Sequence, residues 1–135
     1  MHSTPLSQDF ANRFAQDWIA AWNSHDLDRV LAHYTDDFCM TSPFITQVMG
    51  EGNGTLRGKA EVRKYWQRAL ERFPDLKLTL KEIHVSVQSL AIYYESVLGL
   101  NAIEWFRIGE TGQAEEAIAH FAGLSPRAVD VALDA

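Results

Sequence analysis

The sequence predicts an α+β fold, with helices on one face of a curved, mainly antiparallel sheet. Two observations lead to this prediction. Apolar residues recur at helical spacing in most of the first half of the chain, whereas they alternate with polar residues over much of the second half. A run of helices followed by a run of antiparallel strands is typical of α+β domains. With 135 residues, 47% of them hydrophobic, the chain is expected to form a single domain (1–135) with a substantial core over 8–122.

Three main helices are expected. The first covers residues 8–23, where large apolar side chains recur every three or four positions. Asp26 fits the N-cap of a short second helix, whose apolar face would run to Tyr34. The third helix begins near Gly58 and ends before Pro74. The sequence also contains Ser125-Pro126, a cap followed by proline at the first helical position, which predicts a short helix over about 125–133.

Five strands are expected. The first, 38–42, is ended by Pro43 and followed by a glycine-rich loop over 45–57 that suits a flexible rim or lid. In the segment after residue 76, the apolar parity changes near Lys81-Glu82, which predicts a β-bulge. Hairpin signals at Gly99-Leu100 and at 109–112 separate the last three strands, near 89–98, 101–108 and 113–122.

Composition argues against several classes of partner. The formal charge is −6 and no block of basic residues is present, so neither nucleic acid nor a membrane surface is expected as a partner. One cysteine, Cys39, allows no intramolecular disulfide, and no His, Asp and Glu set has metal-ligand spacing. Neither a metal nor another cofactor is therefore expected. Without a signal peptide or an apolar run of membrane-spanning length, the predicted location is cytoplasmic.

Glu104 is the residue least compatible with its sequence surroundings. It lies within 102–108, a run that otherwise has the character of a buried strand. An ionised carboxylate in such a place is costly unless it is paired, hydrogen-bonded or protonated. A carboxyl group in an apolar, concave site suits acid–base chemistry or the recognition of a polar ligand. The alternative is a structural carboxyl bonded to Trp18, Trp66 or Tyr93.

Strand parity gives Glu104 two candidate neighbours. A two-residue turn at Gly99-Leu100 would place Glu95 directly opposite Glu104, with Cβ atoms about 5 Å apart, and would raise one of the two pKa values. Alternatively, Glu95 is a solvated group at the rim. A four-residue loop at 109–112 would place Glu104 opposite Ala117. The concave face is then expected to carry Ala102, Glu104, Phe106, Ala117, Ala119 and Phe121.

The opposite face of the same strands also carries large apolar side chains. Such a face needs cover, and it is therefore expected to form a homodimer surface. His120 would then be a surface or packing histidine rather than a catalytic one. The residues expected on this outer face are Ile103, Trp105, Arg107, Ile118 and His120.

Three motifs resemble the SnoaL-like branch of the nuclear-transport-factor-2-like superfamily over roughly residues 8–122. They are Trp18-x3-Trp22-Asn23-x2-Asp26-Leu27-Asp28-x4-His33-Tyr34-x-Asp36-Asp37-Phe38, then Gly58-Lys59-x5-Tyr65-Trp66, and Ala119-His120-Phe121. The resemblance implies a cone-shaped α+β barrel, in which three helices pack in the concave face of a strongly bent sheet. It also implies a pocket between helices and sheet, and dimers through the outer face. The fold hosts isomerases, cyclases, dehydratases, epoxide hydrolases and non-catalytic modules.

Ketosteroid isomerase is the informative comparison within that superfamily. Its aspartate base, its tyrosine and its protonated acid correspond by resemblance to Ser42, Trp18 and Glu104. Two of the three groups are thus replaced, which argues against isomerase chemistry of that kind. The resemblance still implies that these positions point into one cavity. The expected ligand-binding residues are Trp18, Trp22, Met40, Ser42, Phe44, Trp66, Phe106, Ala117, Ala119 and Phe121.

Two functions remain open from the sequence. One is an enzyme of the isomerase, cyclase or hydrolase type acting on a small apolar molecule, with Glu104 as general acid or base and Glu95 as a weaker catalytic candidate. The other is a non-catalytic dimeric module that binds a small molecule or a partner. The sequence does not decide whether any reaction is catalysed.

Overall fold

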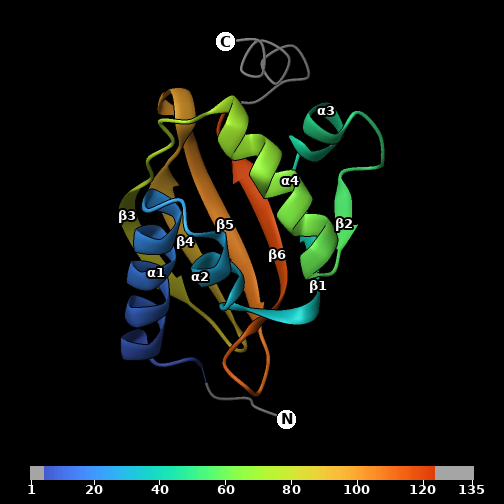
Figure 1. The fold of residues 1–135 in the computed structure, drawn as a ribbon. Coiled ribbons are helices and arrows are strands. Elements are labelled where there is room, and N and C mark those ends of the chain that lie inside the picture. Colours follow the sequence, from blue (N-terminus) through green and yellow to red (C-terminus); the bar gives the residue numbers. More distant parts are fainter. Residues whose placement is uncertain (1–4, 124–135) are drawn as a thin grey trace.

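The α+β fold is confirmed by the computed structural model, which describes residues 5–123 (Figure 1). Two long helices, α1 and α4, lie on the concave face of a curled six-stranded sheet. The elements are α1 (Gln8–Asn23), α2 (Leu27–Leu31), β1 (Tyr34–Thr41), α3 (Ile45–Met49), β2 (Thr55–Arg57), α4 (Lys59–Arg72), β3 (Thr79–Val85), β4 (Ser89–Glu95), β5 (Asn101–Ile108) and β6 (Ala114–Phe121). The helix expected at 125–133 lies outside the described residues.

The sheet is mixed, and it curls without closing into a barrel. Its strand order is β2-β1-β6-β5-β4-β3, so that β2 and β3 form the two edges. Four of the neighbouring pairs are antiparallel, and β1 and β6 are parallel. The first and the last strand in the chain thus lie side by side inside the sheet. Each is hydrogen-bonded to a neighbouring strand along both of its edges.

The helix α1 begins where the sequence predicts, because Ser7 accepts a hydrogen bond from the Phe10 backbone N–H at 3.1 Å. Its C-terminal end is tied to the chain just before β3. The Asn23 side chain donates to the Leu78 carbonyl at 2.9 Å and accepts from the Leu78 N–H at 2.7 Å. One amide therefore satisfies both backbone groups of a residue that lies outside the ladder of β3.

The segment 34–57 differs from the prediction. The strand β1 begins at Tyr34 rather than at residue 38, because the buried Tyr34 ring stacks on Phe38 with centroids 4.3 Å apart and its backbone pairs with β6. The expected loop at 45–57 contains α3 and β2. Gly50, with φ of 80°, ends α3 in the left-handed conformation that glycine adopts without strain.

The bulge predicted near Lys81-Glu82 is confirmed by a register shift between Leu80 and Glu82. The turn from β4 to β5 is longer than predicted. Residues 96–100 form it with a 3-10 turn at Val97–Gly99, and Leu98 has a φ of 56°. As a result Glu95 lies opposite Asn101, and Glu104 lies opposite Ile92. The predicted pairing of Glu95 with Glu104 is therefore wrong.

The register of β6 is shifted by two residues from the prediction. Glu104 lies opposite Ala119, and Phe106 lies opposite Ala117. A shift of two preserves the side of the sheet on which every residue lies. The predicted concave face is accordingly confirmed: its residues are buried, apart from the half-buried Phe121, and Ile103, Arg107 and His120 on the outer face are exposed.

Replacing Asn23 tests the link between α1 and the sheet. We expect Asn23→Ala to lower the free energy of unfolding by about 1–3 kcal/mol, because it leaves both backbone groups of Leu78 without their partner. Urea denaturation measures the change. Asn12→Ala is the matched control, since Asn12 only accepts an exposed hydrogen bond from Gln8. Equal effects of the two substitutions would contradict the proposed role of Asn23.

Candidate ligand pocket around Glu104

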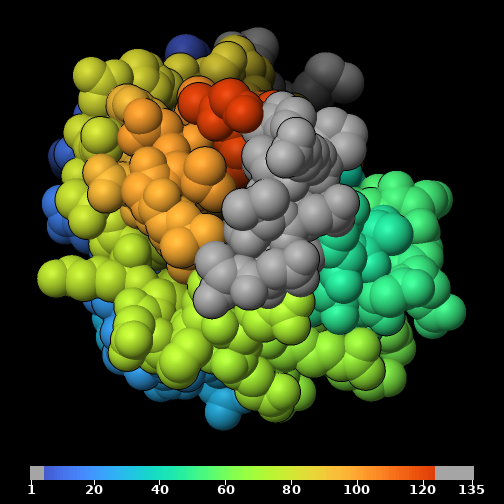
Figure 2. All heavy atoms as spheres, turned by 90° about the horizontal axis from the view of Figure 1, so that it is seen from above, coloured from blue at the N-terminus to red at the C-terminus, as the bar shows by residue number. Residues whose placement is uncertain are grey.

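A cavity of about 100 Å³ lies between the concave face of the sheet and the helices α1 and α4. Its inner part is formed by buried side chains of α1, β1, β4 and β5. Its rim is partly exposed and comes from α3, the end of α4 with the loop after it, the β4–β5 turn and the end of β6. Figure 2 looks onto this end of the molecule, with α3 on one side, the β4–β5 turn on the other and the end of α4 between them.

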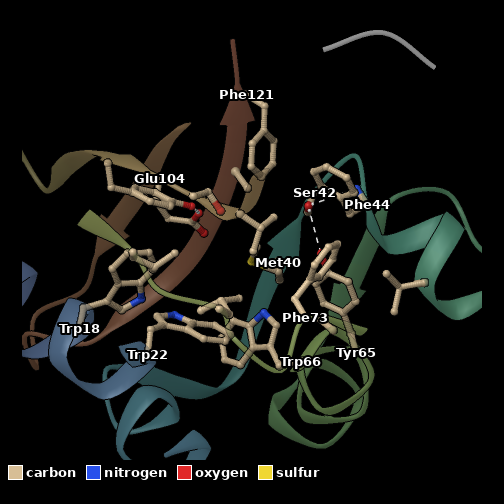
Figure 3. Close-up of a pocket in the computed structure, with 18 residues that line it drawn as sticks. Trp18, Trp22, Met40, Ser42, Phe44, Tyr65, Trp66, Phe73, Glu104 and Phe121 are labelled. Carbon is tan, nitrogen blue, oxygen red and sulfur yellow. Dashed lines mark hydrogen bonds between the residues drawn. The ribbon is translucent and has the colours of Figure 1, made fainter. Parts of the chain in front are cut away.

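Most of the predicted site residues meet in this cavity. Glu104 lines it together with Trp18, Trp22, Met40, Ser42, Phe44, Trp66, Ala119 and Phe121 (Figure 3). Two predicted residues do not line it. Phe106 and Ala117 are fully buried in the core nearby, where the Phe106 ring packs edge-on against Trp18 at 5.5 Å.

Several lining residues were not predicted. Tyr65, Ala69 and Phe73 belong to the apolar stripe of α4, and helical spacing from Trp66 could have placed them in the site. Tyr94 follows from parity once the true register of β4 is known. The rest come from irregular segments or from α3, for which the sequence carries no comparable signal: Val48, Leu76, Leu78, Ser96 and Val97.

The Glu104 carboxyl is almost completely buried, with 3% of the residue exposed. Its hydrogen-bond partner is Tyr94, whose hydroxyl donates to Oε1 at 3.2 Å. Burial raises the pKa of Glu104 to about 8, and the Tyr94 hydrogen bond offsets only part of that effect. At neutral pH Glu104 is therefore mainly an uncharged acid, which has one proton to donate.

The structural partners expected for Glu104 have other roles. Trp18 donates its indole N–H to the Tyr34 hydroxyl at 2.8 Å. Tyr93 lies on the outer face, where the Lys81 ammonium sits 5.5 Å from its ring centroid. Glu95 is exposed at the C-terminal end of β4, 3.9 Å from the Lys81 ammonium. Glu95 therefore does not enter the cavity.

A second polar pair lies at the end of β1. The Tyr65 hydroxyl donates to Ser42 Oγ at 3.3 Å, and the Phe44 backbone N–H donates to the same oxygen at 3.3 Å. Burial raises the pKa of Tyr65, and burial together with the nearby Glu104 carboxyl raises that of Tyr94 well above 10. Both phenols therefore act as neutral hydroxyl groups at any ordinary pH.

Aromatic rings form most of the remaining wall. Trp22 lies edge-on to Trp18 and to Trp66, with ring centroids 6.4 and 5.0 Å apart. The Trp22 indole N–H is the one buried side-chain polar group in the described part of the chain that has no hydrogen-bond partner. A buried donor of this kind costs about 1–3 kcal/mol, and a ligand acceptor that reached it would remove that cost.

The chemistry of the cavity is that of a single acid in an apolar setting. Within the described residues, its lining contains no Lys, Arg or His side chain, and Glu104 is the one carboxyl group there. Over residues 5–123, His, Cys, Asp and Glu form no cluster that could hold a metal ion, and no helix is long and apolar enough to cross a membrane. Arg107 lies on the outer face, bonded to Glu115 at 2.9 Å.

Comparison with known proteins places this geometry in a family. A family model described as a SnoaL-like domain matches residues 15–124. The chain belongs to the SnoaL-like family. Among curated proteins, no sequence match is found.

Several solved structures have the same fold. A SnoaL-like protein of unknown function from Burkholderia thailandensis is 45% identical, with 89% of this chain and 100% of that chain covered and a TM-score of 0.84. IdmH, a putative polyketide cyclase from Streptomyces antibioticus, is 16% identical over 93% and 99% of the two chains, with a TM-score of 0.71. TerC, co-crystallised with polyporic acid, is 15% identical over the same shares, with a TM-score of 0.73.

The burial of Glu104 predicts a stability that depends on pH. Between pH 4.5 and about 8 the unfolded chain releases the Glu104 proton whereas the folded chain keeps it, so the contribution of Glu104 to stability falls as the pH rises and is lost above pH 8. Glu104→Gln removes this dependence while it can still accept from Tyr94. We expect Glu104→Gln to gain stability relative to the parent by as much as about 4 kcal/mol between pH 5 and pH 9.

Denaturant unfolding of both proteins across this pH range measures the difference. Glu95→Gln is the control, because Glu95 is exposed at the end of β4. A difference between Glu104→Gln and the parent that stays constant from pH 5 to pH 9 would contradict a raised pKa.

Proposed function

We propose that the chain binds a small, mainly apolar molecule in this cavity, and that Glu104 acts on it as a general acid. The observation that carries the proposal is the buried carboxyl of Glu104 at the wall of a largely apolar cavity, where burial raises its pKa to about 8. A general acid is most effective when its pKa lies near the working pH, which a pKa of about 8 satisfies. The reaction class that this supports is acid–base chemistry of the isomerase, cyclase or hydrolase type.

The surroundings of Glu104 support this role in two further ways. The Tyr94 hydrogen bond occupies Oε1 and so fixes the orientation of the carboxyl group. The second oxygen, Oε2, has no hydrogen-bond partner among residues 5–123 and carries the proton when Oε1 accepts. The names of structural neighbours are compatible with such chemistry, since IdmH is named as a putative polyketide cyclase and another, 16% identical, as a putative ketosteroid isomerase.

One observation favours a second function, that of a non-catalytic binding module. The part of the cavity wall that residues 5–123 form contains a single carboxyl group, and its hydroxyl groups are those of Ser42, Ser96 and two tyrosines whose pKa values are raised. Most proton-transfer reactions need both an acid and a base. A pocket with one acid suits binding of a neutral molecule without turnover equally well.

Identification of the bound molecule, followed by Glu104→Gln, distinguishes the two functions. Native mass spectrometry of the purified protein tests for a co-purified ligand, and turnover of that ligand is then measured. For an enzyme, we expect Glu104→Gln to keep the fold and ligand binding but to lose about 10²–10⁴-fold in rate. The rate of the parent should fall above pH 8, as Glu104 loses its proton.

The result for the binding module is different. Glu104→Gln would then bind the ligand as before, and neither protein would convert it. Turnover that is the same in Glu104→Gln and in the parent would contradict the role of Glu104 as the acid. Met49→Leu, on α3 outside the residues that line the cavity, is a control that should leave turnover unchanged.

We also propose that two copies of the chain associate through the outer face of β5 and β6. Ile103 is 44% exposed there, between the partly exposed Tyr93 and the exposed His120. Trp105 and Ile118 lie opposite each other on the same face. An apolar strip with charged residues such as Arg107 and Glu116 at its margin has the composition of a symmetric interface.

A charge at the centre of this strip tests the association. We expect Ile103→Asp to convert a dimer to a monomer in analytical ultracentrifugation at micromolar concentration, because a dimer would bury two such carboxylates. Leu98→Asp is the control, since Leu98 is 58% exposed in the β4–β5 turn rather than on the sheet. A parent protein that is monomeric at this concentration would contradict the proposal.

A further inference from the structure

The cavity has polar groups at two separate places on its wall. Glu104 and Tyr94 come from β5 and β4, whereas Ser42 and Tyr65 come from the end of β1 and from α4. Figure 3 shows Glu104 on one side of the cavity and Ser42 with Tyr65 on the other, with Met40 between them. Because β6 separates β1 from β5 in the sheet, the two places are about two strand spacings, or ~10 Å, apart.

The wall between the two places is apolar. Met40 and Ala119 form its sheet side, and the rings of Trp22 and Trp66 lie on the helix side. The small Ala119 side chain lies directly opposite Glu104 on the neighbouring strand and leaves room beside the carboxyl group. A closed cavity of roughly 150 Å³ holds a benzene-sized molecule. One substituted ring therefore fits this cavity of about 100 Å³ only when it also extends into the partly exposed rim.

The hydrogen bonds within the protein determine which donors and acceptors remain for a ligand at the Glu104–Tyr94 end and at the Ser42–Tyr65 end. Glu104 accepts from Tyr94, so its own proton is available for an acceptor on a ligand. Ser42 Oγ already accepts from Tyr65 and from the Phe44 N–H, so its hydroxyl proton is free to donate and the Tyr65 oxygen is free to accept. A hydroxyl group on a ligand satisfies both, since it accepts from Ser42 and donates to Tyr65.

Charge restricts the ligand further. Among residues 5–123 no cationic side chain lines the cavity, so an anionic ligand would lose its hydration without a compensating charge from this part of the chain. We propose that the ligand is an uncharged, flat molecule with a carbonyl oxygen at the Glu104–Tyr94 end and a hydroxyl group at the Ser42–Tyr65 end. This inference rests on the proposed ligand-binding function of the same cavity and specifies the chemical class of the ligand.

Four one-ring compounds test the proposal by isothermal titration calorimetry at pH 7. Ethylbenzene has neither polar group, acetophenone has the carbonyl, 4-hydroxyacetophenone has both groups, and 4-hydroxybenzoate replaces the ketone by a carboxylate. We expect 4-hydroxyacetophenone to bind about tenfold more tightly than acetophenone, and acetophenone more tightly than ethylbenzene. The carboxylate is expected to bind more weakly than acetophenone.

Two variants test whether the ligand hydroxyl group binds at the Ser42–Tyr65 end. In Ser42→Ala and in Tyr65→Phe, the advantage of 4-hydroxyacetophenone over acetophenone should disappear, while the affinity for acetophenone stays the same. Thr41→Ala is the matched control, because Thr41 precedes Ser42 but its hydroxyl pairs with that of Thr55, in an exposed position. Two independent substitutions at the Ser42 end keep the test valid if one of them disturbs the fold.

The outcomes separate this inference from the function on which it rests. Equal affinities for acetophenone and 4-hydroxyacetophenone, or tightest binding of 4-hydroxybenzoate, would overturn the two-ended neutral ligand but leave a binding cavity. If ethylbenzene binds as tightly as the other compounds, the two-ended neutral ligand is likewise overturned and a binding cavity remains. No binding of any of the four compounds at millimolar concentration would overturn both the inference and the proposed ligand-binding function.

Discussion

The structure depends on the burial of one carboxyl group. Glu104 is placed in the middle of β5, with Ile92 and Ala119 as its cross-strand neighbours and a single hydrogen bond from Tyr94. An ionised carboxylate there would lack the several hydrogen bonds or the cation that normally compensate for lost hydration. Protonation is the solution available to this site, and it turns a charge that would destabilise the fold into a neutral donor facing a cavity. Glu104 is therefore kept in its protonated form by burial and not by a second catalytic side chain.

The cavity itself results from a mismatch in side-chain size between two layers. The sheet contributes small residues near Glu104, above all Ala119, while α1 and α4 contribute tryptophans that are too rigid to fill the space left by alanine. Contacts around the cavity hold these rings in place. Trp18 is fixed by its bond to the Tyr34 hydroxyl, and the end of α1 is fixed by Asn23 on the backbone of Leu78. Because α1 is held at Trp18 and at its C-terminal end, its collapse onto the alanines would require these hydrogen bonds to break.

Sequence reasoning located the faces of the sheet but not its register. Alternation along 102–108 assigned Glu104 to the concave side correctly, because side-chain parity survives any shift by two. The residue opposite Glu104 on β4 was predicted wrongly, because the β4–β5 turn is longer than expected. Leu98 in this turn has a left-handed φ of 56°, which the sequence does not predict for a leucine. The side chain that contacts the Glu104 carboxyl is therefore Tyr94 and not Glu95. The short elements α3 and β2 carry too few residues for a periodic signal, although α3 contributes Val48 to the rim.

A solitary neutral acid also limits the chemistry that the pocket can support. Glu104 can donate a proton to a carbonyl oxygen, but the raised pKa values of Tyr65 and Tyr94 leave these phenols unsuited to removing a proton from carbon. Reactions that need a protein base on the opposite side of the substrate are therefore disfavoured. An intramolecular reaction, in which the substrate supplies its own nucleophile and the protein supplies shape and one proton, makes the smallest demand on these side chains. Among acid–base reactions, ring closure of an activated carbonyl compound is thus more compatible with this pocket than the transfer of a proton between two carbon atoms.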